Sequence, residues 1–243
     1  MNLLPIFLSA LIAYLLAALP TGYLAGRLWG VDVRQHGSGR TGGSNVLRSA
    51  GWGAFAVTVI GDIAKGALGV MIARALFPDA IEAHAVAVFF ALLGHVWSVW
   101  IALLAKPDAR ETFASPPLGW IQMIAQRGRG GAGVSPLAGA LMTLYPPLAL
   151  VAPFGLIILT VTRYSSVASI SVCVATPMLM LYFVLTAQAP VSYFFSALSA
   201  CALIIFLLRP NIERLRAGNE RKFGERLGRR ARSDAPDSKK ETE

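Results

Sequence analysis

The stretch GSGRTGGSNVLRSAG, residues 37–51, lies between two long apolar runs and contains five glycines and two arginines. Glycine lets the backbone adopt positive φ and brings successive N–H groups together in a concave nest that favours anions. Arg40 and Arg48 add permanent positive charge in a planar fork that fits phosphate. Ser38, Ser44 and Asn45 add neutral hydrogen-bond donors. These features predict a phosphate-binding cradle at a membrane surface.

A simpler reading of the same stretch stays open at this point. The loop could be flexible, with arginines that only set the orientation of the flanking spans. The glycine spacing matches neither the GxxxxGK[ST] pattern nor the GxGxxG pattern of nucleotide-binding loops.

The composition indicates an integral membrane protein. The chain has 243 residues, of which 55% are hydrophobic and 14% are charged, whereas a soluble domain carries roughly 25% charged residues. The net charge of +9 is concentrated in a few loops and after Arg209, which favours contact with membrane lipids and argues against nucleic acid as a partner. Cys173 and Cys201 lie in apolar runs, so we expect buried thiols and neither a disulfide nor a metal site.

Seven apolar runs predict an all-α fold of about seven transmembrane helices. The runs are 3–24, 54–76, 83–105, two short ones within 134–161 that turn at 145–147, 167–187 and 191–208. Residues 1–208 would form the membrane domain, with active-site loops at 37–51 and 127–135. Residues 209–243 would form a basic cytoplasmic segment that ends in a disordered tail.

The charge distribution predicts the orientation of these spans. Arginines and lysines gather in alternate loops and in the C-terminal segment, with Arg74 as an exception. Under the positive-inside rule, the N-terminus lies outside and the C-terminus lies in the cytoplasm, as in a multi-pass protein of a bacterial inner membrane. Three polar clusters, 37–51, 127–135 and 209–224, then share the cytoplasmic face.

Four segments carry a family resemblance. GSGRTGGSNVLRSAG resembles the first signature, GSGNxGATNVxRxxG, of the membrane acyl-phosphate glycerol-3-phosphate acyltransferases of the PlsY type. DIAKGALGV (62–70) is similar to the DxxKG segment of that family, TRYSSVASI (162–170) to its RYxSxASI segment, and PNIERLRAGNERKFG (210–224) to its third signature. The segments occur in the order of the family and cover nearly the whole chain.

The chain also departs from the family pattern. The second signature begins at Gly94 and His95, and residues 101–125 then intervene before RGRGGAGVSP. The replaced positions are Ser98 for proline, Arg129 and Ala132 for two lysines, Pro136 for threonine, Leu208 for histidine and Arg40 for asparagine. We expect Arg40 to restore, from another loop, the positive charge that is lost at Ala132.

The resemblance implies transfer of a fatty acyl group from acyl phosphate to the 1-hydroxyl of glycerol 3-phosphate, giving lysophosphatidate and phosphate. The catalytic residues would be Ser38, Asn45, Arg48 and His95. The substrate-binding residues would be Gly37, Gly39, Arg40, Gly42, Ser44, Lys65, Arg129, Gly130, Gly131, Gly133, Arg209 and Asn211. Ser38 would donate a hydrogen bond instead of acting as a nucleophile, and no metal or cofactor is implied.

Several alternatives remain at this stage. Lys65 could pair with Asp62 instead of facing the substrate, and His95 could be a hydrogen-bonded core residue. The chain could be a divergent paralogue with another acceptor or donor, or with no catalytic activity. It could also be a small lipid transporter, although the sequence shows no internal repeat. The oligomeric state is open, with a monomer as one option.

Overall fold

The computed structural model describes residues 3–104 and 113–225, and over these residues it is built of helices without a strand. Three of these helices are long and apolar enough to cross a membrane: Leu4–Leu28, which comprises α1 (Leu4–Ala17) and α2 (Thr21–Leu28), α4 (Trp52–Leu76) and α10 (Ser165–Leu185). A fourth is formed if α11 (Val191–Leu207) and α12 (Arg209–Arg216), which meet at 52°, are taken together. The predicted all-α fold is confirmed.

The remaining elements are shorter. The apolar ones are α5 (Ile81–Val96), α8 (Val134–Leu144) and the segment Pro146–Thr162, which comprises η2 (Pro146–Leu150) and α9 (Val151–Thr162). The others are η1 (Val33–Gln35), α3 (Gly43–Ala50), α6 (Val99–Leu104) and α7 (Leu118–Arg127). The turn that was predicted at 145–147 separates α8 from η2.

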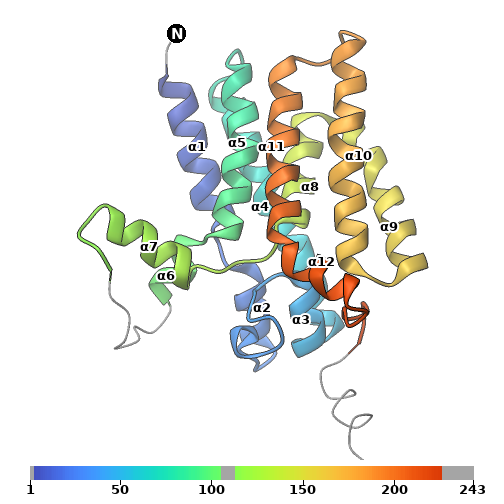
Figure 1. Ribbon diagram of the computed structural model, residues 1–243. Coiled ribbons are helices and arrows are strands. Elements are labelled where there is room, and N and C mark those ends of the chain that lie inside the picture. Colours follow the sequence, from blue (N-terminus) through green and yellow to red (C-terminus); the bar gives the residue numbers. More distant parts are fainter. Residues whose placement is uncertain (1–2, 105–112, 226–243) are drawn as a thin grey trace, which may run out of the picture.

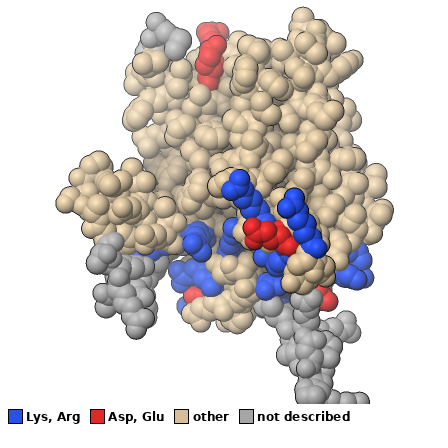
Figure 2. Space-filling model, viewed as in Figure 1, with Lys and Arg blue, Asp and Glu red and all other residues tan. Residues whose placement is uncertain are grey.

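The long helices stand side by side in one bundle (Figure 1). The N-terminal end of α1 lies at one end of the bundle, and α2, α3 and α12 lie together at the other end. Lysines and arginines gather at this second end, around α3 and α12 (Figure 2). The three polar clusters therefore meet on one side, as the charge distribution predicts.

One predicted span is shorter than expected. The run 83–105 was predicted to form one helix, but α5 ends at Val96 and the chain is extended at Trp97, where it pairs with Arg129. The break has a physical cause, since Ser98 is held from two sides. Its N–H donates to the carbonyl of Gly128 at 2.8 Å, and its hydroxyl donates to the carbonyl of Ala18 at 2.5 Å.

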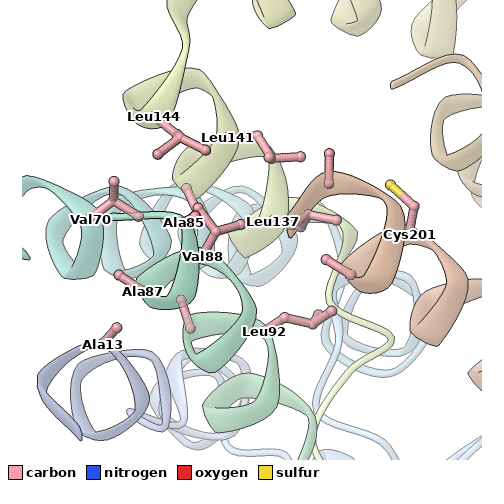
Figure 3. Packing of buried hydrophobic residues seen from close by; sticks show 14 of the residues in the cluster. Ala13, Val70, Ala85, Ala87, Val88, Leu92, Leu137, Leu141, Leu144 and Cys201 are labelled. Carbon is pink, nitrogen blue, oxygen red and sulfur yellow. The ribbon is translucent and has the colours of Figure 1, made fainter. Parts of the chain in front are cut away.

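Small residues bring the helix backbones close together in the core. The buried cluster in Figure 3 combines residues of α1, α4, α5, α8 and α11, among them Ala13, Val88 and Leu137. In α4, a Cβ atom on Gly66 would collide with the Pro136 carbonyl of α8. Helices in lipid lack a hydrophobic force between them and associate through such close packing.

We expect Gly66→Ala to destabilise the protein, because the added methyl group has no room against Pro136. Overpacking a tight contact costs about 1–3 kcal/mol. Thermal unfolding of the purified protein in detergent should show a lower midpoint. Ala64→Val, which adds volume at an exposed position of α4, serves as the control and should leave the midpoint unchanged. Equal midpoints for the two variants would contradict a close α4–α8 contact.

Candidate active site

The predicted cradle is held in shape by the buried side chain of Asn45. Its Nδ2 lies 2.9 Å from the carbonyl oxygens of Val33 and Arg40 and 3.0 Å from that of His36. Its Oδ1 accepts a hydrogen bond from the amide of Ser38 at 3.1 Å. The amide group of Asn45 is therefore engaged in closing the loop on itself.

Glycines give the cradle its curvature and its contact with the second loop. Gly37 and Gly39 have φ of 61° and 68°, in the left-handed region that glycine adopts readily. Gly42 caps the N-terminus of α3, and a Cβ atom there would lie 2.9 Å from the Cα of Gly131. The loops 37–51 and 127–135, far apart in sequence, are thus in direct backbone contact.

The second loop also contacts the C-terminal end of α5. The amide of Gly130 donates to the carbonyl of Val96 at 2.9 Å, and a Cβ atom on Gly130 would collide with the carbonyl of His95. A Cβ atom on Gly131 would come within 2.6 Å of His95 Nε2. Side chains at these two positions would therefore push the loop away from His95.

The three polar clusters surround one cavity of about 660 Å³. Most residues that were predicted for the site line it: Gly37, Ser38, Arg40, Gly42, Ser44, Asn45, Arg48, His95, Arg129, Gly131, Gly133 and Asn211. Four predicted residues do not line it: Gly39, Lys65, Gly130 and Arg209.

Arginines give one end of the cavity a strong positive charge. Burial lowers the pKa of the Arg40 guanidinium, and the neighbouring Arg129 and Arg214 lower it further. Burial likewise lowers the pKa of Arg48, with Arg221 adding to the effect. The Nε of Arg48 is buried and has no hydrogen-bond partner within residues 3–104 and 113–225. Positive charge that is partly desolvated and in excess favours an anionic ligand.

The third cluster is braced by a carboxylate. Glu220 is buried, and it accepts hydrogen bonds from Asn211 Nδ2 at 2.9 Å and from Arg214 Nε at 2.7 Å. These bonds hold α12 against the segment that follows it. Arg209 points elsewhere, with its guanidinium 4.4 Å from the centre of the Phe206 ring.

Asp62 lines the cavity and is the centre of a group of polar side chains. Thr21 donates its hydroxyl proton to Asp62 Oδ1, and the same oxygen lies 3.0 Å from Lys65 Nζ and 3.5 Å from His95 Nδ1. Lys65 Nζ also donates to the carbonyl of Leu19 at 2.6 Å. Lys65 is thus occupied by internal partners, which favours the structural pair with Asp62 over direct contact with a substrate.

Two serines at the start of α10 also line the cavity, although the sequence reasoning did not select them. Ser166 is 1% exposed, and its hydroxyl has no hydrogen-bond partner in the part of the chain that the structure describes. It lies beside Ser165 in the first turn of α10, where free backbone amides favour an anion. Their only sequence signal is that they fall within the TRYSSVASI segment.

The other end of the cavity is apolar and extends between three helices. Its lining includes Leu137 and Leu141 of α8, Val151 and Leu159 of α9, and Val172 and Thr176 of α10. From Ser165 to Thr176 the cavity follows α10 for about 16 Å, at 1.5 Å per residue. This length is similar to half of a hydrocarbon core that is about 30 Å thick. The two free cysteines, Cys173 and Cys201, are buried in the same lining.

The cavity can therefore hold an amphiphile, with its anionic group among the arginines and its chain between the helices. Among residues 3–104 and 113–225, His, Cys, Asp and Glu side chains form no group of three or more that could bind a metal ion.

Comparison with known proteins agrees with this geometry. The family described as "Glycerol-3-phosphate acyltransferase" matches residues 7–105 and 114–218. A glycerol-3-phosphate acyltransferase of Rubrobacter xylanophilus is 37% identical over 91% of this chain and 96% of its own length. One of Thermus thermophilus is 37% identical over 90% of this chain and 96% of its own length.

Two solved structures share the fold. They are crystal structures of PlsY, described as an integral membrane glycerol 3-phosphate acyltransferase, in its glycerol 3-phosphate and lysophosphatidic acid forms. Each is 28% identical and covers 90% of this chain and 95% of its own, with TM-scores of 0.70 and 0.68. The fold, the cavity and these matches together show that the chain belongs to the glycerol-3-phosphate acyltransferase family of integral membrane enzymes.

Proposed function

We propose that this enzyme takes its acyl group from acyl phosphate and transfers it to the 1-hydroxyl of glycerol 3-phosphate. The products are lysophosphatidate and inorganic phosphate. The observation that carries the proposal is the single cavity with an arginine-rich end and an apolar end, which suits a phosphate attached to a fatty chain. The glycerol 3-phosphate and lysophosphatidic acid forms of PlsY support the acceptor and the product.

The cavity suggests how the reactants are held. Arg48, with its unpartnered buried Nε, and Arg40 and Arg129 would bind the two phosphate groups. Ser38 and Ser166 would donate hydrogen bonds to phosphate or carbonyl oxygens. The fatty chain would occupy the apolar part between α8, α9 and α10.

The remaining predicted residues take supporting roles. We assign Asn45 to positioning, because its amide closes the cradle. His95 lines the cavity beside Asp62 and would orient the reacting groups. We assign Lys65 to the structural pair with Asp62 in place of the substrate contact that was predicted for it.

The chemistry needs orientation and charge stabilisation more than a covalent intermediate. The hydroxyl oxygen attacks the acyl carbon, a new ester bond forms, and the bond from the acyl carbon to the phosphate oxygen breaks. A phosphate oxygen of the substrate takes the hydroxyl proton. The arginines stabilise the phosphate that leaves and the oxyanion that develops in the transition state.

We further propose the full membrane topology. The segments Leu4–Leu28, Trp52–Leu76, Ile81–Val96, Val134–Leu144, Pro146–Thr162, Ser165–Leu185 and Val191–Leu207 would make seven crossings. The N-terminus would lie outside a bacterial inner membrane, and the arginine-rich end of the cavity would face the cytoplasm. Soluble glycerol 3-phosphate would then enter from the cytoplasm, while the acyl donor would enter from lipid.

The purified protein should release phosphate from palmitoyl phosphate only when glycerol 3-phosphate is also present. Arg48→Gln should lower kcat/KM by about 100-fold or more, because it removes a charged donor from the cavity. Arg216→Gln, an exposed position on α12, is the matched control and should keep the wild-type rate. Phosphate release that is independent of glycerol 3-phosphate, or absent from the folded protein, would contradict the proposed reaction and would favour a paralogue with other substrates.

Ser38→Ala should reduce turnover without abolishing the binding of the acyl donor, because Ser38 supplies a hydrogen bond and forms no bond to carbon. The measurements are kcat and KM for palmitoyl phosphate, together with mass spectrometry of the intact protein during turnover. An acyl group trapped on Ser38 would overturn this role.

Val172→Phe should shift the preference of the enzyme from palmitoyl phosphate to octanoyl phosphate, because Val172 lines the apolar part of the cavity. A change of packing on this scale in an apolar pocket alters a selectivity ratio by about tenfold or more. Val174→Phe, on the exposed side of the same helix, is the control and should leave the ratio unchanged. Equal ratios for the two variants would place the fatty chain elsewhere.

A further inference from the structure

Residues 97–104 leave the bundle with α6, and residues 113–128 return to it with α7, so that the two helices form the arms of a hairpin. Ser98 N donates to the carbonyl of Gly128 at 2.8 Å, and Trp97 pairs with Arg129. These contacts join the two ends of the segment that contains α6 and α7. The match to the family includes both α6 and α7 and is interrupted at residues 106–113.

The helix α7 presents an unpartnered apolar face. At 3.6 residues per turn, Leu118, Ile121 and Trp120 lie on an arc of about 160° around the helix, with Ile121 between the other two. Their side chains are 54%, 62% and 63% exposed, respectively. Gln126 lies on the opposite face. Gln122 lies at the polar edge of the apolar arc, where it accepts a hydrogen bond from the amide of Ala114. The helix is thus amphipathic, and its apolar face contacts nothing within the described part of the chain that would cover it.

Exposed apolar residues of α6 lie near exposed leucines of α1. Trp100 of α6 donates its indole N–H to the carbonyl of Leu15 in α1 at 3.0 Å. The neighbouring Leu103 and Leu104 are 61% and 56% exposed. Leucines along α1 are exposed on the same outer surface of the bundle: Leu11, Leu15 and Leu19. Figure 1 shows α6 and α7 projecting beside the lower ends of α1 and α5, at the end where the basic loops gather.

We propose that the α6–α7 hairpin is an interfacial anchor, and that the lipid bilayer itself covers its apolar face. Amphipathic helices with tryptophan, leucine and isoleucine on one face lie in the plane of the interface with that face among the headgroups and upper acyl chains. Tryptophan is enriched at this depth because its ring has both apolar and polar parts. The hairpin would hold its own base, and with it Arg129 of the cavity, at the membrane surface.

The test measures the surroundings of two faces of α7 in the full chain. Ile121→Cys and Gln126→Cys are each labelled with an environment-sensitive fluorophore, and the protein is reconstituted into vesicles of phosphatidylcholine and phosphatidylglycerol. Cys173 and Cys201 are each 2% exposed, and the parent protein is labelled in parallel to measure their background. Quenching is then compared between nitroxide-bearing lipids and iodide in the water.

The probe at 121 should show blue-shifted emission and lose most of its intensity to nitroxide lipids, whereas the probe at 126 should be quenched mainly by iodide. Equal iodide quenching at both positions would place α7 in water and overturn the proposal. A probe at 121 that is shielded from both quenchers would show that protein, such as a second copy of the chain, covers this face. Equal lipid quenching at both positions would exclude an oriented interfacial helix. None of these outcomes depends on the acyl donor, because the readout is contact with lipid.

Discussion

A carboxylate inside a membrane bundle is costly unless it is paired, and the structure around the cavity depends on how Asp62 meets this requirement. Its partners come from three elements: Thr21 of α2, Lys65 of α4 and His95 of α5. The lysine in turn donates to the carbonyl of Leu19, which lies at the break between α1 and α2 and also accepts the amide of Thr21. One buried anion thus fixes the relative positions of the elements that carry the first loop and the start of the second.

The arginines of the three loops give the cavity an excess of positive charge, whereas the charge of Asp62 is balanced by Lys65. Arg40 belongs to the first loop, Arg129 to the second loop and Arg214 to the third cluster. Arg129 and Arg214 are close enough to Arg40 to lower its pKa. Because the positive charge comes from three loops, one cation can be carried by a different loop without changing the total charge around the cavity. Arg40 and Ala132 line the same cavity, which supports our expectation that Arg40 makes up for the charge missing at Ala132.

The sequence was sufficient for features that depend on composition and was insufficient for those that depend on contacts. The apolar runs predicted most of the helices. The clustering of arginines correctly predicted that the three loops lie at one end of the bundle. The end of α5 at Val96 could not be foreseen, because Gly128 and Ala18, distant in sequence, hold Ser98. Ser166 could not be selected from the sequence for a similar reason. Only the folded structure shows that its buried hydroxyl lacks a hydrogen-bond partner within the described residues.

Glycine allows close contact between backbones both in the helix bundle and at the cavity. The same kind of contact therefore contributes to the stability of the bundle and to the shape of the cavity. Gly66 lets α4 touch the backbone of α8, whose first residues line the cavity, while Gly42 and Gly131 let two loops touch beside His95. In both places a single Cβ atom would separate backbones that must meet. Because α8 follows directly after the second loop, a shift of α8 against α4 would also move Gly131 and Arg129. Residues away from the cavity therefore set the distance between the groups that we propose to bind phosphate.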